Sequence, residues 1–157
     1  EKKGVFPEKK LEDIDAGQFA HYFHSNVTLP ALWLKHLPAL LPKVQPSKVA
    51  FLSARVGSIT DNQLGGWYGY RSSKAALNML IKTAQVELAR RYKQCALMLY
   101  HPGTVDTRLS APFQANVPQE KLFTPEFTAT QLASLLAEIS VEGAPHYRDW
   151  KGEVIPW

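Results

Sequence analysis

Two side chains in this sequence, Tyr70 and Lys74, have the types and the spacing needed for acid/base chemistry. Residues four apart lie on the same face of a helix, so a phenol and an ammonium at these positions can interact. A free tyrosine has a pKa of about 10, roughly two to three units too high for ready proton exchange at neutral pH. An ammonium about 4 Å away supplies about 4 kcal/mol at an effective dielectric of about 20, which is enough to lower it. The pair can therefore form a general acid/base, but the pattern alone more often marks a capped helix start with a solvated lysine, and the context decides between the two.

The segments around Tyr70 predict the elements that position it. Residues 71–92 contain no proline or glycine and place their apolar side chains on one face, which predicts a long helix. The glycine-rich stretch 55–69 predicts a loop before this helix, and residues 49–53 predict a buried strand before the loop. The apolar run 95–100 predicts a second buried strand after the helix.

The N-terminal part of the chain also predicts a helix. Apolar side chains recur at spacings of about three to five over residues 13–32, and Asp13 or Asp15 can cap the start. Prolines interrupt or kink a helix because they lack the N–H donor. Those expected to act here are Pro30 and Pro38, with Pro42 at the end.

The C-terminal part completes an alternating order of helices and strands. After an irregular loop over residues 104–123, Thr124-Pro125-Glu126 predicts the start of a helix that runs to about Val141. Residues 153–157 predict a last short strand or a tail. Apolar strands that alternate with amphipathic helices predict an α/β fold, with a parallel sheet of about three strands covered on both faces.

Four motifs in this order resemble those of the short-chain dehydrogenase/reductase family. They are Asn26 in the helix before the first strand, the strand segment 49–57, the Tyr70–Lys74 motif and the Pro-Gly segment 101–107. The amino-acid sequences of these motifs are most similar to those of the bacterial C-factor-like members. The resemblance spans most of the chain. It implies a Rossmann-like doubly wound fold and an NAD(P)-dependent oxidoreductase that interconverts a carbonyl and an alcohol.

The resemblance also implies a role for each of these residues. Tyr70 would donate a proton to the carbonyl during reduction, and Lys74 would lower its pKa and bind the nicotinamide ribose. Asn26 would hold a water in a proton relay to Lys74. Both Tyr70 and Lys74 would therefore contact NAD or NADP. The other residues that the resemblance places against the cofactor are Pro102, Gly103, Val105 and Thr107.

The serine of the family motif has three candidate positions. Counting back from Gly57, the catalytic serine of the family falls at Ala54. Ser53 is next to it, although neighbours on a strand point to opposite faces, and Ser58 is another alternative. We expect Ser53 to serve. Without a serine, one hydrogen bond to the substrate oxygen is lost, and catalysis slows while the fold remains.

The family's dinucleotide-binding unit has no counterpart before Asn26. Residues 1–25 are too few for the early βαβ units and contain no glycine-rich fingerprint. We therefore expect residues 1–157 to form a single partial domain, the C-terminal catalytic half of the fold, that is inactive alone. The alternative is a non-catalytic truncated fragment that acts as an assembly or interaction module, since an open sheet edge gains from pairing.

Composition limits the compartment and the partners. Of the 157 residues, 45% are hydrophobic and 20% charged, which is typical of a globular chain, and the net charge of +4 is too small to imply a nucleic-acid partner. No apolar stretch reaches the roughly 18 residues of a membrane span. The single cysteine, Cys95, indicates a reducing compartment, so we expect a cytoplasmic protein. The scattered His21, His24 and His36 predict no metal site. The expected partners are a small carbonyl or alcohol substrate and further copies of the chain.

Overall fold

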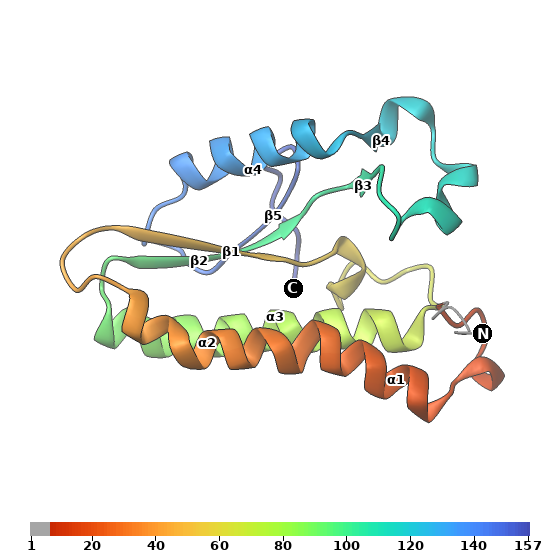
Figure 1. Cartoon of the computed structure of the whole chain (residues 1–157), viewed down its shortest axis with the longest axis horizontal. Helices are drawn as coiled ribbons and strands as arrows, with labels where there is room; N and C mark the ends of the chain where they lie inside the picture. The colour runs from red at the N-terminus through yellow and green to blue at the C-terminus, as the bar shows by residue number, and fades with distance from the viewer. Residues whose placement is uncertain (1–6) are drawn as a thin grey trace.

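The centre of the molecule is a three-stranded parallel sheet flanked by helices. The computed structural model describes residues 7–157, and residues 1–6 lie outside the described part. The strands follow the order β1 (Ser47–Leu52), β2 (Cys95–His101) and β5 (His146–Asp149). The helices are α1 (Ala16–Phe23), α2 (Leu29–Leu40), α3 (Tyr68–Arg91) and α4 (Pro125–Glu138). Figure 1 shows α1, α2 and α3 below the sheet and α4 above it, which confirms the predicted α/β arrangement.

A single wide turn joins α1 to α2. It is a π-helical turn over His24–Thr28, with Asn26 at its middle. Pro30 has no N–H, so the carbonyl oxygen of Asn26 lacks its usual α-helical donor, and the backbone widens at this point. The predicted interruption at Pro30 is therefore a π-turn, and no break in the helix occurs. Pro38 lies inside α2, which ends at Leu40 before Pro42.

The other helix starts follow the sequence signals. The Asp15 carboxylate accepts a hydrogen bond from the backbone N–H of Gln18 at 2.9 Å. The Thr124 hydroxyl oxygen accepts one from the N–H of Phe127 at 3.1 Å. Helix α3 begins three residues earlier than predicted, so Tyr70 lies in its first turn. Side-chain caps of this kind satisfy N–H groups that have no partner within the helix.

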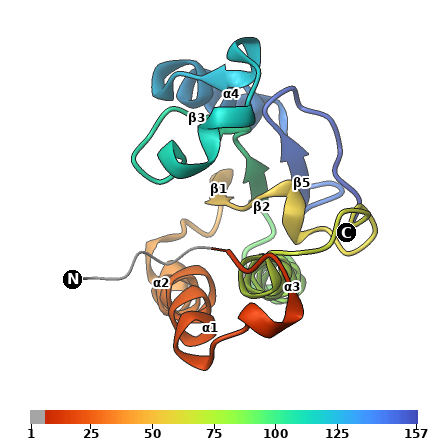
Figure 2. The same cartoon turned by 90° about the vertical axis from the view of Figure 1, so that its right-hand side faces the viewer.

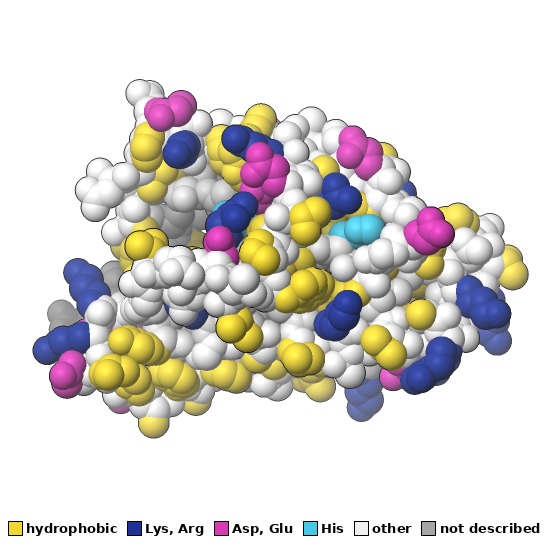
Figure 3. All heavy atoms as spheres, turned by 180° about the vertical axis from the view of Figure 1, so that it is seen from behind, with side chains coloured by type: hydrophobic (Ala, Val, Ile, Leu, Met, Phe, Trp, Pro, Cys, Tyr) yellow, Lys and Arg dark blue, Asp and Glu magenta, His cyan; other side chains and the backbone are white. Residues whose placement is uncertain are grey.

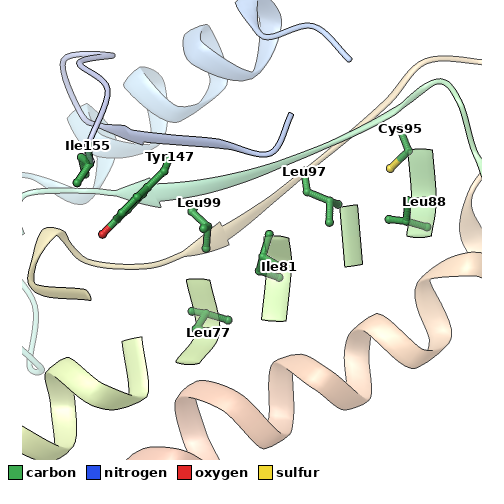
Figure 4. Close-up of a cluster of buried hydrophobic side chains, with 8 residues drawn as sticks. All are labelled: Leu77, Ile81, Leu88, Cys95, Leu97, Leu99, Tyr147 and Ile155. Carbon is green, nitrogen blue, oxygen red and sulfur yellow. The ribbon is translucent and has the colours of Figure 1, made fainter. Parts of the chain in front are cut away.

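Strand β2 holds the core together because both of its faces are buried. Every residue from Cys95 to Tyr100 is at most 1% exposed. Alternate side chains on a strand point to opposite faces, and they join two separate clusters. The cluster on the α3 side, drawn in Figure 4, contains Leu77, Ile81, Leu88, Cys95, Leu97, Leu99, Tyr147 and Ile155. The cluster on the α4 side contains Ala96, Met98, Tyr100, Leu135 and Ile139.

The last strand lies elsewhere than predicted. Of the strand and the tail expected at residues 153–157, the strand does not form, and the third strand of the sheet is β5, His146–Asp149. The C-terminal segment makes a single antiparallel bridge, from Val154 to Arg148. Its Ile155 is fully buried against the core. Strand β5 carries three polar residues in four, so no apolar run marked it in the sequence.

Strand β1 forms a free edge of the sheet. The expectation of a buried strand is wrong here, since its residues are half-buried or exposed and Leu52 is 61% exposed. No strand of residues 7–157 pairs with its outer side. Figure 2, which looks at the molecule from the right-hand side of Figure 1, shows β1, β2 and β5 between the two helical layers. Parallel sheets normally have both edges and faces protected, so this edge can accept a further strand.

Candidate active site

A cleft of about 590 Å³ lies where strands β1 and β2 end and helix α3 begins. Its other wall is the segment between β3 (Thr104–Val105) and β4 (Leu122–Phe123), two short strands that pair in parallel. Figure 3 shows the molecule hollowed on this side. Parallel α/β folds bind their ligands at the carboxyl ends of the strands, which is where this cleft is.

Tyr70 and Lys74 lie side by side, as their spacing predicts. The Lys74 Nζ is 5.8 Å from the centre of the Tyr70 ring and donates a hydrogen bond to the Leu52 carbonyl oxygen at 3.0 Å. Tyr70 lines the cleft, and Lys74 is 8% exposed beneath it. The phenol and the amino group that proton transfer would need are thus held within about one turn of α3.

The pKa of Tyr70 shifts in the direction opposite to our prediction. Burial raises the pKa of the Tyr70 phenol, because the phenolate loses its hydration. Burial also lowers the pKa of Lys74, to about 8. The ammonium points at the Leu52 carbonyl, and a lowering of the tyrosine pKa would need it to turn toward the hydroxyl.

The lowered pKa of Lys74 predicts that stability rises in mild alkali. Since Lys74 titrates at about 8 when folded and at 10.5 when unfolded, the unfolded chain binds more protons between these values. The free energy of unfolding should therefore rise from pH 8 to pH 10, by up to about 3 kcal/mol. Urea unfolding at several pH values measures this.

Lys74→Met is the matched control, because it keeps the side-chain length and removes the titrating group. Burial raises the pKa of Cys95, which acts in the opposite direction in this pH range. The quantity to compare is therefore the difference between wild type and Lys74→Met. If that difference does not change with pH, Lys74 is not a desolvated ammonium.

Asn26 is tied to the same helix. Its side-chain amide donates a hydrogen bond to the Ser73 hydroxyl oxygen at 3.0 Å, and Ser73 donates to the Tyr70 carbonyl oxygen at 2.8 Å. Asn26 therefore contacts α3 one residue before Lys74. Its own carbonyl oxygen, left without an α-helical donor by Pro30, is a further acceptor in this region.

The three candidate positions for the serine lie in different surroundings. Ser53 lines the cleft but is 4% exposed, and its hydroxyl donates to the Asn78 side chain at 2.7 Å. Asn78 in turn donates to the Gly57 carbonyl oxygen at 3.2 Å. Ala54 also lines the cleft. Ser58 is buried, and its oxygen accepts a backbone N–H within its own loop.

The Pro-Gly segment forms the wall opposite Tyr70. Pro102, Gly103, Val105 and Thr107 all line the cleft. Gly103 has a φ of 75°, and a Cβ at this position would lie 2.6 Å from the Phe123 ring. A glycine is therefore required both by the backbone conformation and by the close approach of β4.

The structure adds cleft residues to which the sequence analysis gave no role of their own. His101 precedes the Pro-Gly turn, and its Nδ1 is buried without a hydrogen-bond partner. Burial and the nearby Arg55 lower the pKa of His101 to about 4, so the imidazole is neutral at pH 7. Tyr22 faces Tyr70, and burial together with the Glu8 carboxylate raises the pKa of Tyr22 to about 12. The chemical signal for both was their residue type, and nothing in their spacing singled them out.

Residues 7–157 contain neither a membrane-spanning helix nor a metal-ligand cluster. None of the helices within residues 7–157 is both long enough and apolar enough to cross a membrane. Across the same residues, no three His, Cys, Asp or Glu side chains gather as metal ligands would. Cys95, the single cysteine, is 1% exposed in the core.

Comparison with known proteins shows the family. Residues 3–118 match the family model described as short chain dehydrogenase, so the chain belongs to the short-chain dehydrogenase/reductase family, as the motifs indicated. C-signal of Myxococcus xanthus is 31% identical over 150 residues, which cover 94% of this chain and 83% of that protein. A 1-hydroxy-2-glutathionyl-2-methyl-3-butene dehydrogenase of Rhodococcus sp. (strain AD45) is 31% identical, over 79% of this chain and 53% of that protein.

Solved structures of the family share the fold. Carbonyl reductase Sniffer of D. melanogaster superimposes with a TM-score of 0.81 at 20% identity, covering 96% of this chain and 61% of that chain. The NADPH-bound carbonyl reductase from chicken fatty liver superimposes with a TM-score of 0.81 at 23% identity, covering 99% of this chain and 64% of that chain. The chain therefore spans less than two thirds of these two structures and about half of the Rhodococcus enzyme.

Proposed function

We propose that this chain is the catalytic half of an NAD(P)-dependent oxidoreductase that interconverts a carbonyl and an alcohol, with Tyr70 as the general acid/base. The observation that carries the proposal is Tyr70 at a cleft, with Lys74 beneath it and the Pro-Gly segment opposite, in a chain of this family. Residues 1–157 form one partial domain in this proposal. Its activity alone is low or absent.

The residues present suit the nicotinamide half of the cofactor. Gly103 lines the cleft on the wall opposite Tyr70, and the unpartnered Nδ1 of His101 offers a polar group on the same side. The residues that would hold the nicotinamide are Pro102, Gly103, Val105 and Thr107. Within residues 7–157, no strand with a glycine-rich turn precedes α1 to hold the pyrophosphate and adenine half. The cofactor, when bound, supplies the hydride.

The chain supplies the proton and its path. During reduction the Tyr70 hydroxyl donates its proton to the carbonyl oxygen, and during oxidation the phenolate takes the proton back. In the proposed reaction, the Lys74 ammonium gives up its hydrogen bond to the Leu52 carbonyl oxygen and turns toward the nicotinamide ribose and the Tyr70 hydroxyl. An ammonium about 4 Å from the phenolate contributes about 4 kcal/mol, which opposes the effect of burial. Asn26 holds the water through which Lys74 is reprotonated, and Ser53 donates to the substrate oxygen once it leaves Asn78.

A comparison of two nucleotides tests the partial site. Residues 1–157 are titrated with NADPH and with reduced nicotinamide mononucleotide, which lacks the adenine half. Since only the nicotinamide half has partners in the described residues, we expect the two dissociation constants to agree within about threefold. If NADPH binds about a hundredfold tighter, the chain holds a complete dinucleotide site and the partial-domain proposal is wrong.

The second candidate is a non-catalytic assembly or interaction module. It is favoured by Ala54 at the family's serine position and by the free edge of β1. It is also favoured by the match to most of the length of a protein called C-signal. Apolar side chains exposed on α2 and α3 offer a surface for a second copy, and Figure 3 shows exposed hydrophobic side chains on the lower part of the molecule. The residues that would take part include Leu32, Leu40, Met79 and Val86. Binding of neither nucleotide, together with a stable dimer, would favour this module over the enzyme.

We also propose a cytoplasmic location for either function. The single cysteine is a buried free thiol, and such thiols are usual in reducing compartments. A substrate for the enzyme would then be a small cytoplasmic carbonyl or alcohol.

A further inference from the structure

A row of four aromatic rings runs through the cleft, and the proposed proton donor Tyr70 is the second of them. Each ring contacts the next edge-on or tilted, which is the arrangement that aromatic pairs prefer. The ring centres are 5.8 Å apart for Tyr22 and Tyr70, 6.1 Å for Tyr70 and Trp67, and 5.5 Å for Trp67 and Phe113. All four side chains line the cleft.

Trp67 is held in an unusual backbone conformation. Its φ of 55° lies in the left-handed region, and within residues 7–157 every other positive φ belongs to a glycine. Its N–H donates to the Glu8 carbonyl oxygen at 2.6 Å. The Glu8 carboxylate, itself 2% exposed, accepts the N–H of Gly69 at 3.1 Å. A left-handed tryptophan persists only where its surroundings hold it, so the position of this ring is strongly specified.

The row joins the two walls of the cleft. Trp67 lies immediately before α3, whereas Phe113 lies in the 3-10 helix Ala111–Asn116 on the opposite wall. The lining also contains apolar side chains, among them Val56, Leu109 and Pro112, and polar ones, among them Ser53, His101, Thr107, Arg108 and Ser110. The row of rings leads from Tyr70 through Trp67 to Phe113. The cleft therefore suits a molecule whose polar atom reaches Tyr70 and whose flat apolar body lies along Trp67 and Phe113.

We propose that the substrate of this site is a carbonyl compound with a planar aromatic ring next to the carbonyl group, and that Trp67 and Phe113 determine this specificity. The inference rests on the proposed function, because it places the carbonyl oxygen at the Tyr70 hydroxyl. The ring of the substrate then lies against Trp67 and Phe113. Aromatic contacts stabilise beyond the area that they bury, so two of them give a preference of about tenfold over a saturated ring.

Phenyl methyl ketone and cyclohexyl methyl ketone are the matched probes, since both carry a six-membered ring on the same carbonyl group and only one of the rings is planar and aromatic. Binding of each to residues 1–157 is measured by ligand-observed NMR titration, which needs neither cofactor nor turnover. We expect the phenyl ketone to bind about tenfold more tightly. Trp67→Gly removes the ring at a position where glycine is unstrained, and it should abolish the preference.

Further variants keep the test decisive if Trp67→Gly does not fold. Trp67→Phe retains an aromatic ring and should retain the preference, whereas Phe113→Leu keeps an apolar side chain and should lose most of it. Trp33→Leu is the control outside the cleft, at a side chain that is 72% exposed on α2, and it should change nothing. Equal binding of the two ketones by the wild type, or a preference that survives in Phe113→Leu, overturns the inference.

The outcomes separate this inference from the proposed function. If carbonyls are reduced and the phenyl ketone is not preferred, the specificity inference is wrong and the proposed function stands. If the phenyl ketone binds with the expected preference and no carbonyl is reduced by any form of the protein, the proposed function is wrong and the preference of the cleft for an aromatic ketone stands. Binding of neither ketone overturns the assignment of this cleft to an aromatic carbonyl.

Discussion

Tyr70→Phe should lower kcat by about a thousandfold and leave the free energy of unfolding nearly unchanged. The substitution removes only the hydroxyl, which in our proposal supplies the proton. The ring remains, with its contacts to Tyr22 and Trp67 at 5.8 Å and 6.1 Å, so the packing at the start of α3 is preserved. Because residues 1–157 alone are expected to have little activity, kcat is measured as carbonyl-dependent oxidation of NADPH in a full-length form of the protein. Urea unfolding measures stability.

Tyr22→Phe is the matched control for this experiment. Tyr22 lines the same cleft and packs edge-on against Tyr70, but the pKa of its phenol is about 12, which makes it a poor acid or base at pH 7. We expect kcat to change less than about tenfold in this variant. Activity retained in Tyr70→Phe would refute the role of Tyr70. Equal losses in both variants would show that the cleft needs two hydroxyls.

The elements that the sequence predicted well are those with strong local signals. The run 95–100 consists of apolar residues that are all buried in β2, and the periodic apolar side chains of residues 71–92 lie in α3. Strand β5 has no such signal, because its buried residues are Tyr147 and Asp149. Tyr147 donates to the Ala54 carbonyl oxygen, 93 residues away in the chain. Because β5 depends on a hydrogen bond to a residue so far away in the chain, its own composition does not predict it as a buried strand.

The features of the site also fall into those that local spacing predicts and those that depend on contacts distant in the sequence. That Tyr70 and Lys74 are neighbours follows from helical spacing alone, and the structure agrees. Which way the ammonium points depends on the Leu52 carbonyl, 22 residues earlier, and the depth of burial depends on the whole fold. Both effects determine the pKa values, so the direction for Tyr70 was predicted wrongly. The contact between Trp67 and Phe113 is also long-range and could not be predicted from the sequence.

Asp149→Ala should lower the free energy of unfolding by about 3 kcal/mol. Asp149 ends strand β5 and is 4% exposed. Its carboxylate accepts from the Arg55 guanidinium at 2.7 Å and from the backbone N–H groups of Lys151 and Glu153 at 3.0 and 3.1 Å. These hydrogen bonds connect β5 to the loop that follows β1, through Arg55, and to the C-terminal segment, through Lys151 and Glu153. Alanine leaves both N–H groups without this acceptor and Arg55 without this carboxylate, at a position where Asp149 itself is 4% exposed.

Asp149→Asn separates the charge from the hydrogen bonds, because its amide oxygen can still accept both N–H groups. We expect it to cost about 1 kcal/mol, since the Arg55 side chain is 36% exposed and its ion pair is partly screened by water. Glu87→Ala removes an ion pair with Arg91 that is half exposed on α3, and it should cost less than about 0.5 kcal/mol. Urea unfolding of the three variants gives the order. If Asp149→Asn is as damaging as Asp149→Ala, the charge on Asp149 is the stabilising feature and the backbone hydrogen bonds are secondary.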